Sequence, residues 1–512
     1  MKLTLKTQAL VLIITFVITL GLTACGLNRS HKDIPREPDS ATPNGLIAYS
    51  GEISGEDPSR ALPTPSTTPQ AGFGPIVGPD ATSQPPATHP PQTADAGPQP
   101  STPTPEAAGA PFGPIVGPGH TLVPTETHVA PTVPPTPIPT AGPSPTPGPE
   151  LHRELMGVQI HPQIDSREYA DVLARIADLG VGWIKFQYNW SLLESAPGQY
   201  TELLYILNEY VKQAHAAGLK TMISVAKAPG WSRTPDSDGI MRENGPPDDP
   251  QALARFLAGM LAQLGTDSQG KPFVDAIEVW NEPNLNREWY GFPMTGSTYM
   301  AYFAPAYLAI RAFSSEIIVI TAAPAPTGDS DVSTDDRLWL QQLYGAGLAQ
   351  YGSDVAVGIH PYGWGNPPDA RCCANPSHGW DDQPQFFFLD TIEDYREIMI
   401  ANGHASAQLW TTEFGWATFD GLNSSAGDQP TIPGDSAYIA FVNQAQQASY
   451  TIRAFEIGQS LPYMGPMILW NLNFSTIDGA VERGDLKAGY SLVDNGWQPR
   501  PAYYALQQAP KQ

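Results

Sequence analysis

The sequence Trp280-Asn281-Glu282-Pro283-Asn284 closes an apolar, β-branched run that begins at Ala276. A second run of this kind ends in Thr412-Glu413-Phe414-Gly415-Trp416, and its glutamate lies 131 residues after Glu282. Each run therefore places a glutamate at the end of a predicted strand, where parallel barrel strands carry their functional side chains. The interval between the two glutamates is far too long for a local turn, and it accommodates three further strand–helix units.

Apolar runs and helical patterns alternate from Leu151 to the end of the chain. Eight runs are typical of strands, and apolar residues at helical spacing lie between them. Eight strands, each followed by a helix, predict a closed (β/α)8 barrel over residues 151–512, an α/β fold in which Glu282 follows the fourth strand and Glu413 the seventh. The predicted strands are Met156–Ile160, Trp183–Phe186, Thr221–Val225, Ala276–Trp280, Ile317–Thr321, Val355–Ile359, Gln408–Thr412 and Pro466–Asn471. The predicted helices include Tyr169–Leu179, Leu203–Ala217, Pro250–Leu264, Thr298–Phe313 and Ala437–Gln459.

The first 25 residues are predicted to be a processing signal. Lys2 and Lys6 precede an apolar stretch, Ala9–Leu22, that is too short and too close to the N-terminus for a spanning helix. The stretch ends in Leu22-Thr23-Ala24-Cys25, which resembles the lipobox of bacterial lipoproteins, in which the cysteine is lipid-modified. The alternative is an ordinary secretory signal. Both predict a protein outside the cytoplasm, either anchored to the cell membrane through Cys25 or secreted.

Residues 26–150 form a predicted linker. More than half of the 55 prolines lie here together with many threonines and serines, whereas all 12 tryptophans lie after Leu151. Such a segment cannot bury enough apolar surface to offset its chain entropy, so we expect a disordered stalk. The heptapeptide Phe73–Pro79 recurs as Phe112–Pro118, which fits either a docking motif or a duplication within the linker.

The charge and the motifs exclude several classes of protein. The chain has 51 acidic and 27 basic residues and a net charge of −24, whereas a nucleic-acid-binding surface needs a basic excess. No phosphate-binding glycine motif or nucleophile-elbow serine is present, and no His or Cys residues stand at metal-ligand spacing. We expect no cofactor, no metal, no nucleic-acid partner and a monomer. The adjacent Cys372 and Cys373 leave a vicinal disulfide, free thiols and a bond between chains as alternatives.

Enzymatic cleavage of a glycosidic bond typically requires two carboxyl groups on opposite sides of one pocket. Asn281-Glu282-Pro283 and Glu413-Phe414-Gly415, in this order and on these strands, resemble clan A of the glycoside hydrolases, the (β/α)8 group that includes families 5 and 39. The resemblance implies a retaining, two-step cleavage with Glu282 as acid/base and Glu413 as nucleophile. These roles require a raised pKa for Glu282 and a low pKa for Glu413. The alternative is two solvated surface glutamates.

The resemblance also implies substrate-binding roles for residues near the two glutamates. Asn281 is expected to bind the sugar 2-hydroxyl, although an asparagine at this position can also cap a turn. His360 and Tyr362 follow the sixth strand, and the phenol is expected to contact Glu413 and to hold it ionised. The alternative for both is packing in the core.

Aromatic and basic residues complete the predicted site. Trp470, after the eighth strand, resembles the aromatic platform beneath the reacting sugar. Lys185 stands where many clan members carry arginine, so a point charge replaces the usual bidentate contact. Each tryptophan has core packing as its alternative. Further candidate sugar contacts are Trp190, Trp231, Trp364 and Trp416.

Taken together, these features predict a retaining glycoside hydrolase on a lipid-anchored stalk, acting on a poly- or oligosaccharide outside the cell. The second hypothesis is a carbohydrate-binding surface protein that kept the barrel and lost turnover. Both glutamates count against this second hypothesis, whereas the Lys185 departure keeps it open. Endo or exo action and the sugar specificity depend on the loops at the site, and the sequence alone does not give the conformation of these loops.

Overall fold

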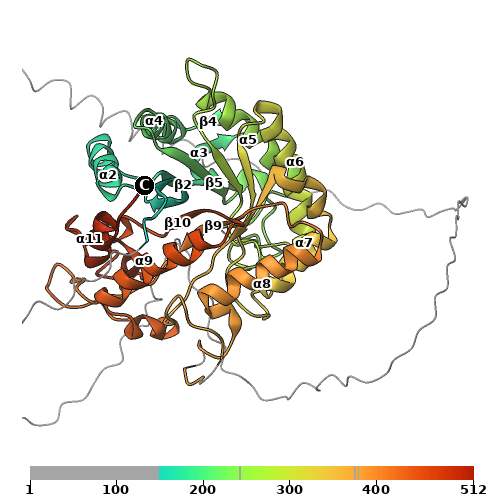
Figure 1. Cartoon of the computed structure of the whole chain (residues 1–512). Helices are drawn as coiled ribbons and strands as arrows, with labels where there is room; N and C mark the ends of the chain where they lie inside the picture. The colour runs from blue at the N-terminus through green and yellow to red at the C-terminus, as the bar shows by residue number, and fades with distance from the viewer. Residues whose placement is uncertain (1–148, 242–243, 374–375, 379) are drawn as a thin grey trace, which may run out of the picture. The chain divides into compact units, whose positions relative to one another are not determined.

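The computed structural model describes residues 149–512 apart from 242–243, 374–375 and 379. Cys25, the predicted linker and the repeated heptapeptide lie outside the described residues. Eight parallel strands close into a barrel in the order β1-β2-β5-β6-β7-β8-β9-β10 (Figure 1). The predicted fold is confirmed, since each predicted strand overlaps an observed one. The strands are β1 Met156–Ile160, β2 Trp183–Asn189, β5 Lys220–Ala226, β6 Ala276–Val279, β7 Ile318–Thr321, β8 Val355–Ile359, β9 Leu409–Phe414 and β10 Met464–Leu469.

Helices surround the barrel (Figure 1). The largest error in a predicted boundary concerns the helix expected at Ala437–Gln459. It begins at Gln444, because Asn443 caps it through Gln446 and residues 434–441 form a 3₁₀ segment. The helices are α2 Ser166–Leu179, α4 Glu202–Ala216, α5 Pro250–Leu264, α6 Gly296–Phe313, α7 Asp336–Gly345, α8 Phe388–Ala401, α9 Gln444–Ser460 and α11 Pro501–Gln508. Shorter elements are α3 Trp190–Leu193, β3 Glu194–Ala196, β4 Gln199–Tyr200 and α10 Leu486–Tyr490. None of the helices within the described ranges is long and apolar enough to cross a bilayer.

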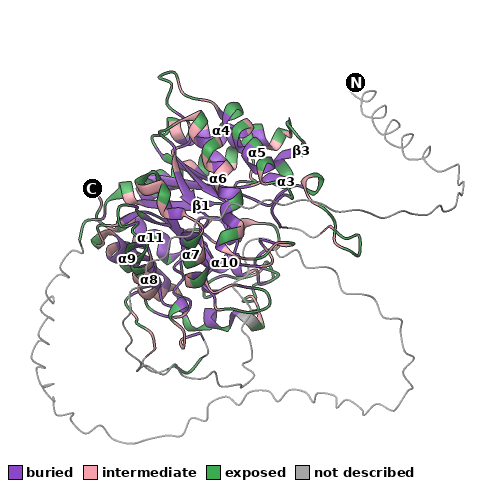
Figure 2. Cartoon of the chain, turned by 90° about the vertical axis from the view of Figure 1, so that its right-hand side faces the viewer, coloured by how far each residue is buried: buried purple, intermediate pink, exposed green. Residues whose placement is uncertain are grey.

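Burial separates the inner and outer faces of these elements. Buried residues colour the strands and the inward faces of the helices, and exposed residues colour the outward faces (Figure 2). The floor of the barrel is an apolar cluster that includes Trp183 on β2 and Ala276 on β6. Two residues further along these strands lie the buried charges Lys185 and Glu278. Side chains two apart on a strand share a face, so a charged layer lies above the apolar floor, toward the carboxyl ends of the strands.

A second aromatic cluster fixes the loops at the carboxyl ends of β8, β9 and β10. It contains Tyr362, Trp364, Trp470 and Tyr490 among its buried members. Gly415, which directly follows β9, is required for this packing. A Cβ atom at Gly415 would lie 2.8 Å from the Trp470 carbonyl oxygen and 3.1 Å from the Tyr490 ring. The glycine therefore lets the ends of β9 and β10 approach each other beside the two glutamates.

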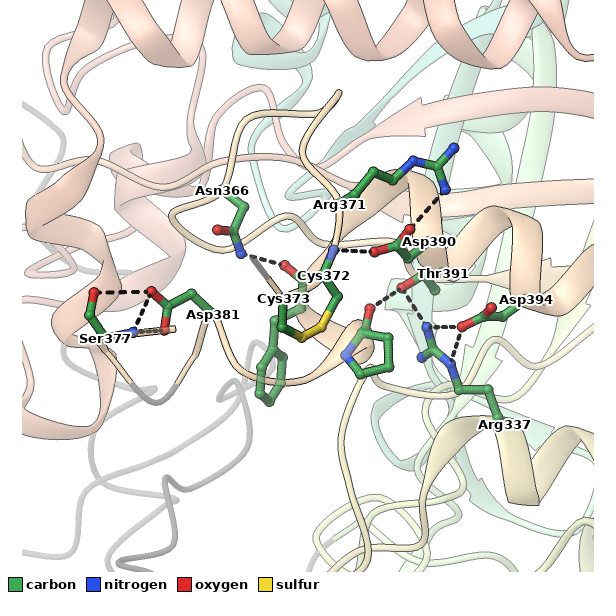
Figure 3. The surroundings of a disulfide bond; sticks show 12 residues. Arg337, Asn366, Arg371, Cys372, Cys373, Ser377, Asp381, Asp390, Thr391 and Asp394 are labelled. Atoms are coloured by element: carbon green, nitrogen blue, oxygen red, sulfur yellow. Dashed lines mark hydrogen bonds and ion pairs between the residues drawn. A yellow bond between two sulfur atoms is a disulfide. The ribbon is translucent and has the colours of Figure 1, made fainter. Parts of the chain in front are cut away.

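The loop between β8 and α8 contains the adjacent cysteines. Cys372 and Cys373 are joined by a disulfide, so the structure selects the vicinal pairing among the three alternatives (Figure 3). The Cys372 backbone N–H donates to Asp390 Oδ2 at 2.7 Å, and Arg371 Nη1 donates to Asp390 Oδ1 at 2.8 Å. These bonds attach the cysteine loop to the start of α8.

Candidate active site

The backbone after β6 turns sharply to present Glu282. Trp280 and Glu282 both have positive φ angles, +80° and +42°, a region that costs a non-glycine residue roughly 1–2 kcal/mol. Hydrogen bonds to the loop after β7 stabilise this turn. Glu282 N–H donates to the Ala323 carbonyl at 3.1 Å, and the Asn284 amide exchanges two hydrogen bonds with the Ala325 backbone, at 2.8 and 2.9 Å. The direction of the Glu282 side chain is therefore set by the fold.

Glu282 is 4% exposed, and each of its carboxylate oxygens has a nitrogen partner. Arg287 Nη2 donates to Oε2 at 3.0 Å, and His360 Nδ1 lies 3.1 Å from Oε1. Burial raises the pKa of Glu282, but the His360 hydrogen bond and the Arg287 charge together lower it further, so the pKa lies below its ordinary value. The expected raised pKa was wrong for this state of the site, because the sequence did not reveal Arg287 as a partner.

Glu413, on β9, is 3% exposed and is likewise held through both oxygens. Lys185 Nζ donates to Oε1 at 3.1 Å, and the Tyr362 hydroxyl donates to Oε2 at 3.0 Å. The contact expected between the phenol and this glutamate is therefore present. Both donors point at a carboxylate oxygen, so together they hold Glu413 in one orientation.

Lys185 is completely buried and has three acceptors for its three N–H groups. They are Glu413 Oε1 at 3.1 Å, the Thr412 carbonyl at 3.1 Å and Glu278 Oε2 at 3.0 Å. Burial lowers the pKa of Lys185, but the charges of Glu278 and Glu413 raise it more, so the ammonium stays protonated. Glu278 was not among the predicted site residues, although a lone acidic residue in the apolar run of β6 indicates a buried charge.

His360, directly after β8, is also fully buried and faces three carboxylates. Its Nδ1 contacts Glu282, and its Nε2 lies 4.0 Å from Glu278 Oε1. Burial lowers the pKa of His360, but the charge of Glu413 and the interactions with Glu282 raise it above the ordinary value. The imidazole and Glu282 therefore form a hydrogen-bonded pair beside Glu413.

The aromatic wall of the site comes from the loops after β8 and β10. The Trp470 ring centroid lies 6.1 Å from that of Tyr362, 5.0 Å from Tyr490 and 5.5 Å from Phe474. Two buried polar atoms at this wall and at the β6 turn, Trp470 Nε1 and Asn281 Oδ1, have no partner among the described residues. Buried polar atoms are normally paired, so both are suited to a polar ligand such as a sugar.

The other predicted sugar contacts lie in different environments. Trp190 lies in the core, which was the alternative to a sugar contact: its ring stacks on Phe256 at 4.9 Å and its Nε1 donates to Glu194 Oε2 at 2.6 Å. Trp416 is also a core residue, with Nε1 bonded to the Asn366 carbonyl. Trp231, after β5, is 38% exposed and keeps a surface available for stacking. Trp364 is buried between Phe386 and Tyr438.

A fourth carboxyl, Glu288, lies buried within reach of the charges of Glu282 and Glu413 and was not anticipated. Burial raises its pKa to about 7, and the charges of Glu282 and Glu413 add to this rise, while Lys227 and Arg287 oppose it. Its Oε2 atom has no hydrogen-bond partner within the described part of the chain. Among the same residues, no group of three His, Cys, Asp or Glu side chains is arranged to hold a metal ion.

A closed (β/α)8 barrel with glutamates at the ends of its fourth and seventh strands is the architecture of the clan A glycoside hydrolases. The family model of the cellulases, glycosyl hydrolase family 5, matches residues 145–452. The chain therefore belongs to glycosyl hydrolase family 5. A search of the curated proteins finds no match.

Solved structures similar to this chain include glycoside hydrolases of two families. A family 39 glycoside hydrolase from the gut symbiont Bacteroides cellulosilyticus WH2 is 18% identical to this chain, with a TM-score of 0.48. The match covers 71% of this chain and 65% of the family 39 protein, which is slightly less than two thirds of the length of that protein. A GH39 enzyme from Xanthomonas axonopodis pv. citri is 15% identical with a TM-score of 0.46, over 70% and 67% of the two chains. A GH5_18 protein from Bifidobacterium longum subsp. infantis is 11% identical with a TM-score of 0.48, over 70% and 78%.

Proposed function

We propose that this family 5 chain is a retaining glycosidase in which Glu413 is the nucleophile and Glu282 the general acid/base. One observation carries the proposal: the two glutamates have separate and chemically different partners. A lysine and a phenol hold Glu413, whereas an arginine and a histidine hold Glu282. Two carboxylates in different environments are what a double-displacement cleavage needs.

In the first step, Glu282 donates a proton to the glycosidic oxygen as the bond from this oxygen to the anomeric carbon breaks. Glu413 attacks the anomeric carbon from the opposite face and forms a glycosyl ester. Lys185 and Tyr362 orient Glu413 before the attack, so little rearrangement is needed during it. His360, which is hydrogen-bonded to Glu282 Oε1, is proposed to supply the proton that Glu282 donates in this step.

In the second step, Glu282 is a carboxylate and takes a proton from water, whose oxygen attacks the anomeric carbon. The bond to Glu413 breaks, and the second inversion gives overall retention. The lowered pKa of Glu282 suits this half of the reaction, because Arg287 and His360 stabilise the base form. Asn281 and Trp470 are proposed to bind the 2-hydroxyl and the apolar face of the reacting sugar, and Trp231 a neighbouring unit.

The proposed place of action is outside the cytoplasm. The supporting observations are the N-terminal apolar segment that ends at Cys25 and the proline-rich sequence between it and the barrel. A lipid on Cys25 would anchor the protein to the cell membrane, and the stalk would hold the barrel away from it. The proposed substrate is an extracellular poly- or oligosaccharide.

The test is product detection by mass spectrometry. The parent protein is incubated with plant, microbial and cell-wall glycans beside Glu413→Gln and, as a matched control, Glu397→Gln on the exposed face of α8. Cleavage by the parent and by the Glu397 variant, but not by the Glu413 variant, is expected. Sugar binding by all three proteins without any cleavage would instead support the binding-protein hypothesis and overturn the proposed function.

A further inference from the structure

A cavity of about 420 Å³ opens at the carboxyl end of the barrel and is not lined by either glutamate. Its walls come from five segments of the sequence: the end of β1, the end of β2 with α3, the first turns of α4, the residue Lys227 after β5, and the loop after β10. The carboxyl ends of barrel strands share one mouth, so this cavity belongs to the same face as the proposed catalytic pair.

Two relationships place the cavity directly beside that pair. Gln187, in the cavity wall, lies two residues after Lys185 on β2 and shares its face, and Lys185 contacts Glu413. Phe474, which also lines the cavity, has its ring centroid 5.5 Å from that of Trp470. A glycan chain that places one sugar at the pair can therefore place another unit in this cavity.

The cavity has the opposite charge to the rest of the chain. Its wall contains the cations Lys227, Arg483 and Lys487 and a single carboxylate, Asp485, although the whole chain has 27 basic and 51 acidic residues. The fifth titratable group, His161, contributes no charge near neutrality, because burial and the Lys487 charge lower its pKa to about 4. The lining therefore carries a net positive charge.

Two of these cations are buried: Lys227 is 4% exposed and Lys487 is 7% exposed. Lys487 Nζ lies 3.8 Å from Asp485 Oδ2, which is beyond hydrogen-bond distance, so the ammonium is not saturated by this carboxylate. Buried ammonium groups are costly unless an anion is close. For Lys487 the lining offers the carboxylate of Asp485, and the buried Glu288 acts on it through its charge from outside the lining. The lining is therefore suited to a ligand that carries an anion.

The remaining lining fits a sugar ring. Gln187 and Asn189 supply amide donors and acceptors. Gln159 Nε2 donates to Gln187 Oε1 at 3.5 Å, and the buried Gln159 Oε1 has no hydrogen-bond partner among the described residues. Leu192, Ile477 and Phe474 supply apolar surface. Ligand sites commonly combine apolar walls with a few convergent polar groups.

We infer that this cavity is a subsite for a sugar unit that carries a carboxylate, a hexuronic acid residue, with Lys487 and Arg483 facing the carboxylate and Gln187 and Asn189 facing the ring hydroxyls. The inference deepens the proposed function, since it rests on the chain acting on a glycan and names the chemical class of that glycan. A neutral glycan would leave the charged wall without a counterpart.

The test uses pairs of probes that differ only in the carboxylate. Oligosaccharides from glucuronoxylan and from gellan are compared with the same oligosaccharides after carboxyl reduction, which converts each glucuronosyl unit to its neutral counterpart. Dissociation constants are measured by calorimetry on the full chain carrying Glu413→Gln, so turnover is not required. At least one acidic probe is expected to bind about 10-fold or more tightly than its reduced counterpart, and this preference is expected to fall as salt rises.

Variants then locate the preference. Lys487→Gln and the exposed Arg483→Gln are each expected to weaken binding of the acidic probe without weakening that of its reduced counterpart, whereas Lys271→Gln, near the amino end of β6, keeps the preference. If the Lys487 variant does not fold, the result for Arg483→Gln decides the test by itself. No preference for any acidic probe, or a preference untouched by Arg483→Gln, overturns the inference. A preserved preference in a parent that cleaves no glycan would overturn only the proposed function.

Discussion

Lys185 Nζ lies 3.1 Å from Glu413 Oε1 and donates to it from inside the barrel. The same ammonium lies 3.0 Å from Glu278 Oε2, so the proposed nucleophile shares its cation with a carboxylate that the reaction does not consume. An arginine at this position would present a planar fork, whereas lysine presents three N–H groups that point to three separate acceptors. Lys185 stands where many clan members carry arginine, and each of its three N–H groups has an acceptor in this site.

Replacement of Lys185 by methionine is expected to destabilise the fold by about 3–5 kcal/mol, because two buried carboxylates lose their shared cation. The double variant with Glu278→Met is expected to recover much of this loss but not the activity, since Glu413 still lacks its donor. Chemical denaturation and kcat of the single and double variants check this. A double variant as unstable as Lys185→Met would contradict the pairing.

Replacement of Tyr362 by phenylalanine removes one donor to Glu413 and leaves the ring packing with Trp470 in place. A hydrogen bond to a charged group contributes about 1.5–3 kcal/mol, so kcat/KM is expected to fall about 10–150-fold with little change in thermal stability. Steady-state kinetics and thermal unfolding measure the two effects. Unchanged kinetics would show that this hydroxyl does not act on the nucleophile.

Replacement of Arg287 by glutamine is expected to raise the pKa of Glu282, because the Arg287 charge is one of the interactions that lower it. The alkaline limb of the kcat/KM profile reports the acid that must be protonated, so this limb should move to higher pH. The rate at the optimum is expected to change less than about 10-fold, since the reacting groups remain. A limb that moves to lower pH, or not at all, would remove Arg287 from the acid/base group.

Glu288 provides a pH-dependent test of stability. Its pKa rises from 4.5 in the unfolded chain to about 7 in the folded chain, so the folded state keeps a proton that the unfolded state loses between these values. Parent stability should therefore fall from pH 4.5 to 7 by an amount on the order of 3 kcal/mol from this group. Replacement of Glu288 by glutamine should remove this fall, which denaturation at several pH values measures. Glu397→Gln, on the surface, should keep the parent slope.

The sequence predicted the barrel well because each strand is a short apolar run between helical patterns, and because parallel strands deliver their ends to one face. These two features predicted that Glu282, His360 and Tyr362 lie with Glu413 at the carboxyl end of the barrel, and the structure places them there. The motif spacing was enough, since each residue lies on its own strand or within three residues of its end.

Other features depend on which way a side chain points, and the sequence does not state this. Trp190 follows β2 closely, yet its ring turns toward Phe256 on α5 and joins the core. Glu278 meets Lys185 across the barrel interior, between strands that are not neighbours, so no local pattern couples them. The positively charged cavity is likewise assembled from five separate segments of an acidic chain.

The central claim is that Glu413 forms a covalent bond to the sugar. The most direct measurement is peptide mass spectrometry of the parent after incubation with activated 2-deoxy-2-fluoro glycosides of glucose, xylose, mannose and galactose. Each fluorinated compound is paired with its unfluorinated glycoside, which shows whether the protein cleaves that sugar. We predict one added glycosyl group, located on Glu413. A label on another residue, or no label from the fluorinated form of a glycoside that is cleaved, would contradict the account.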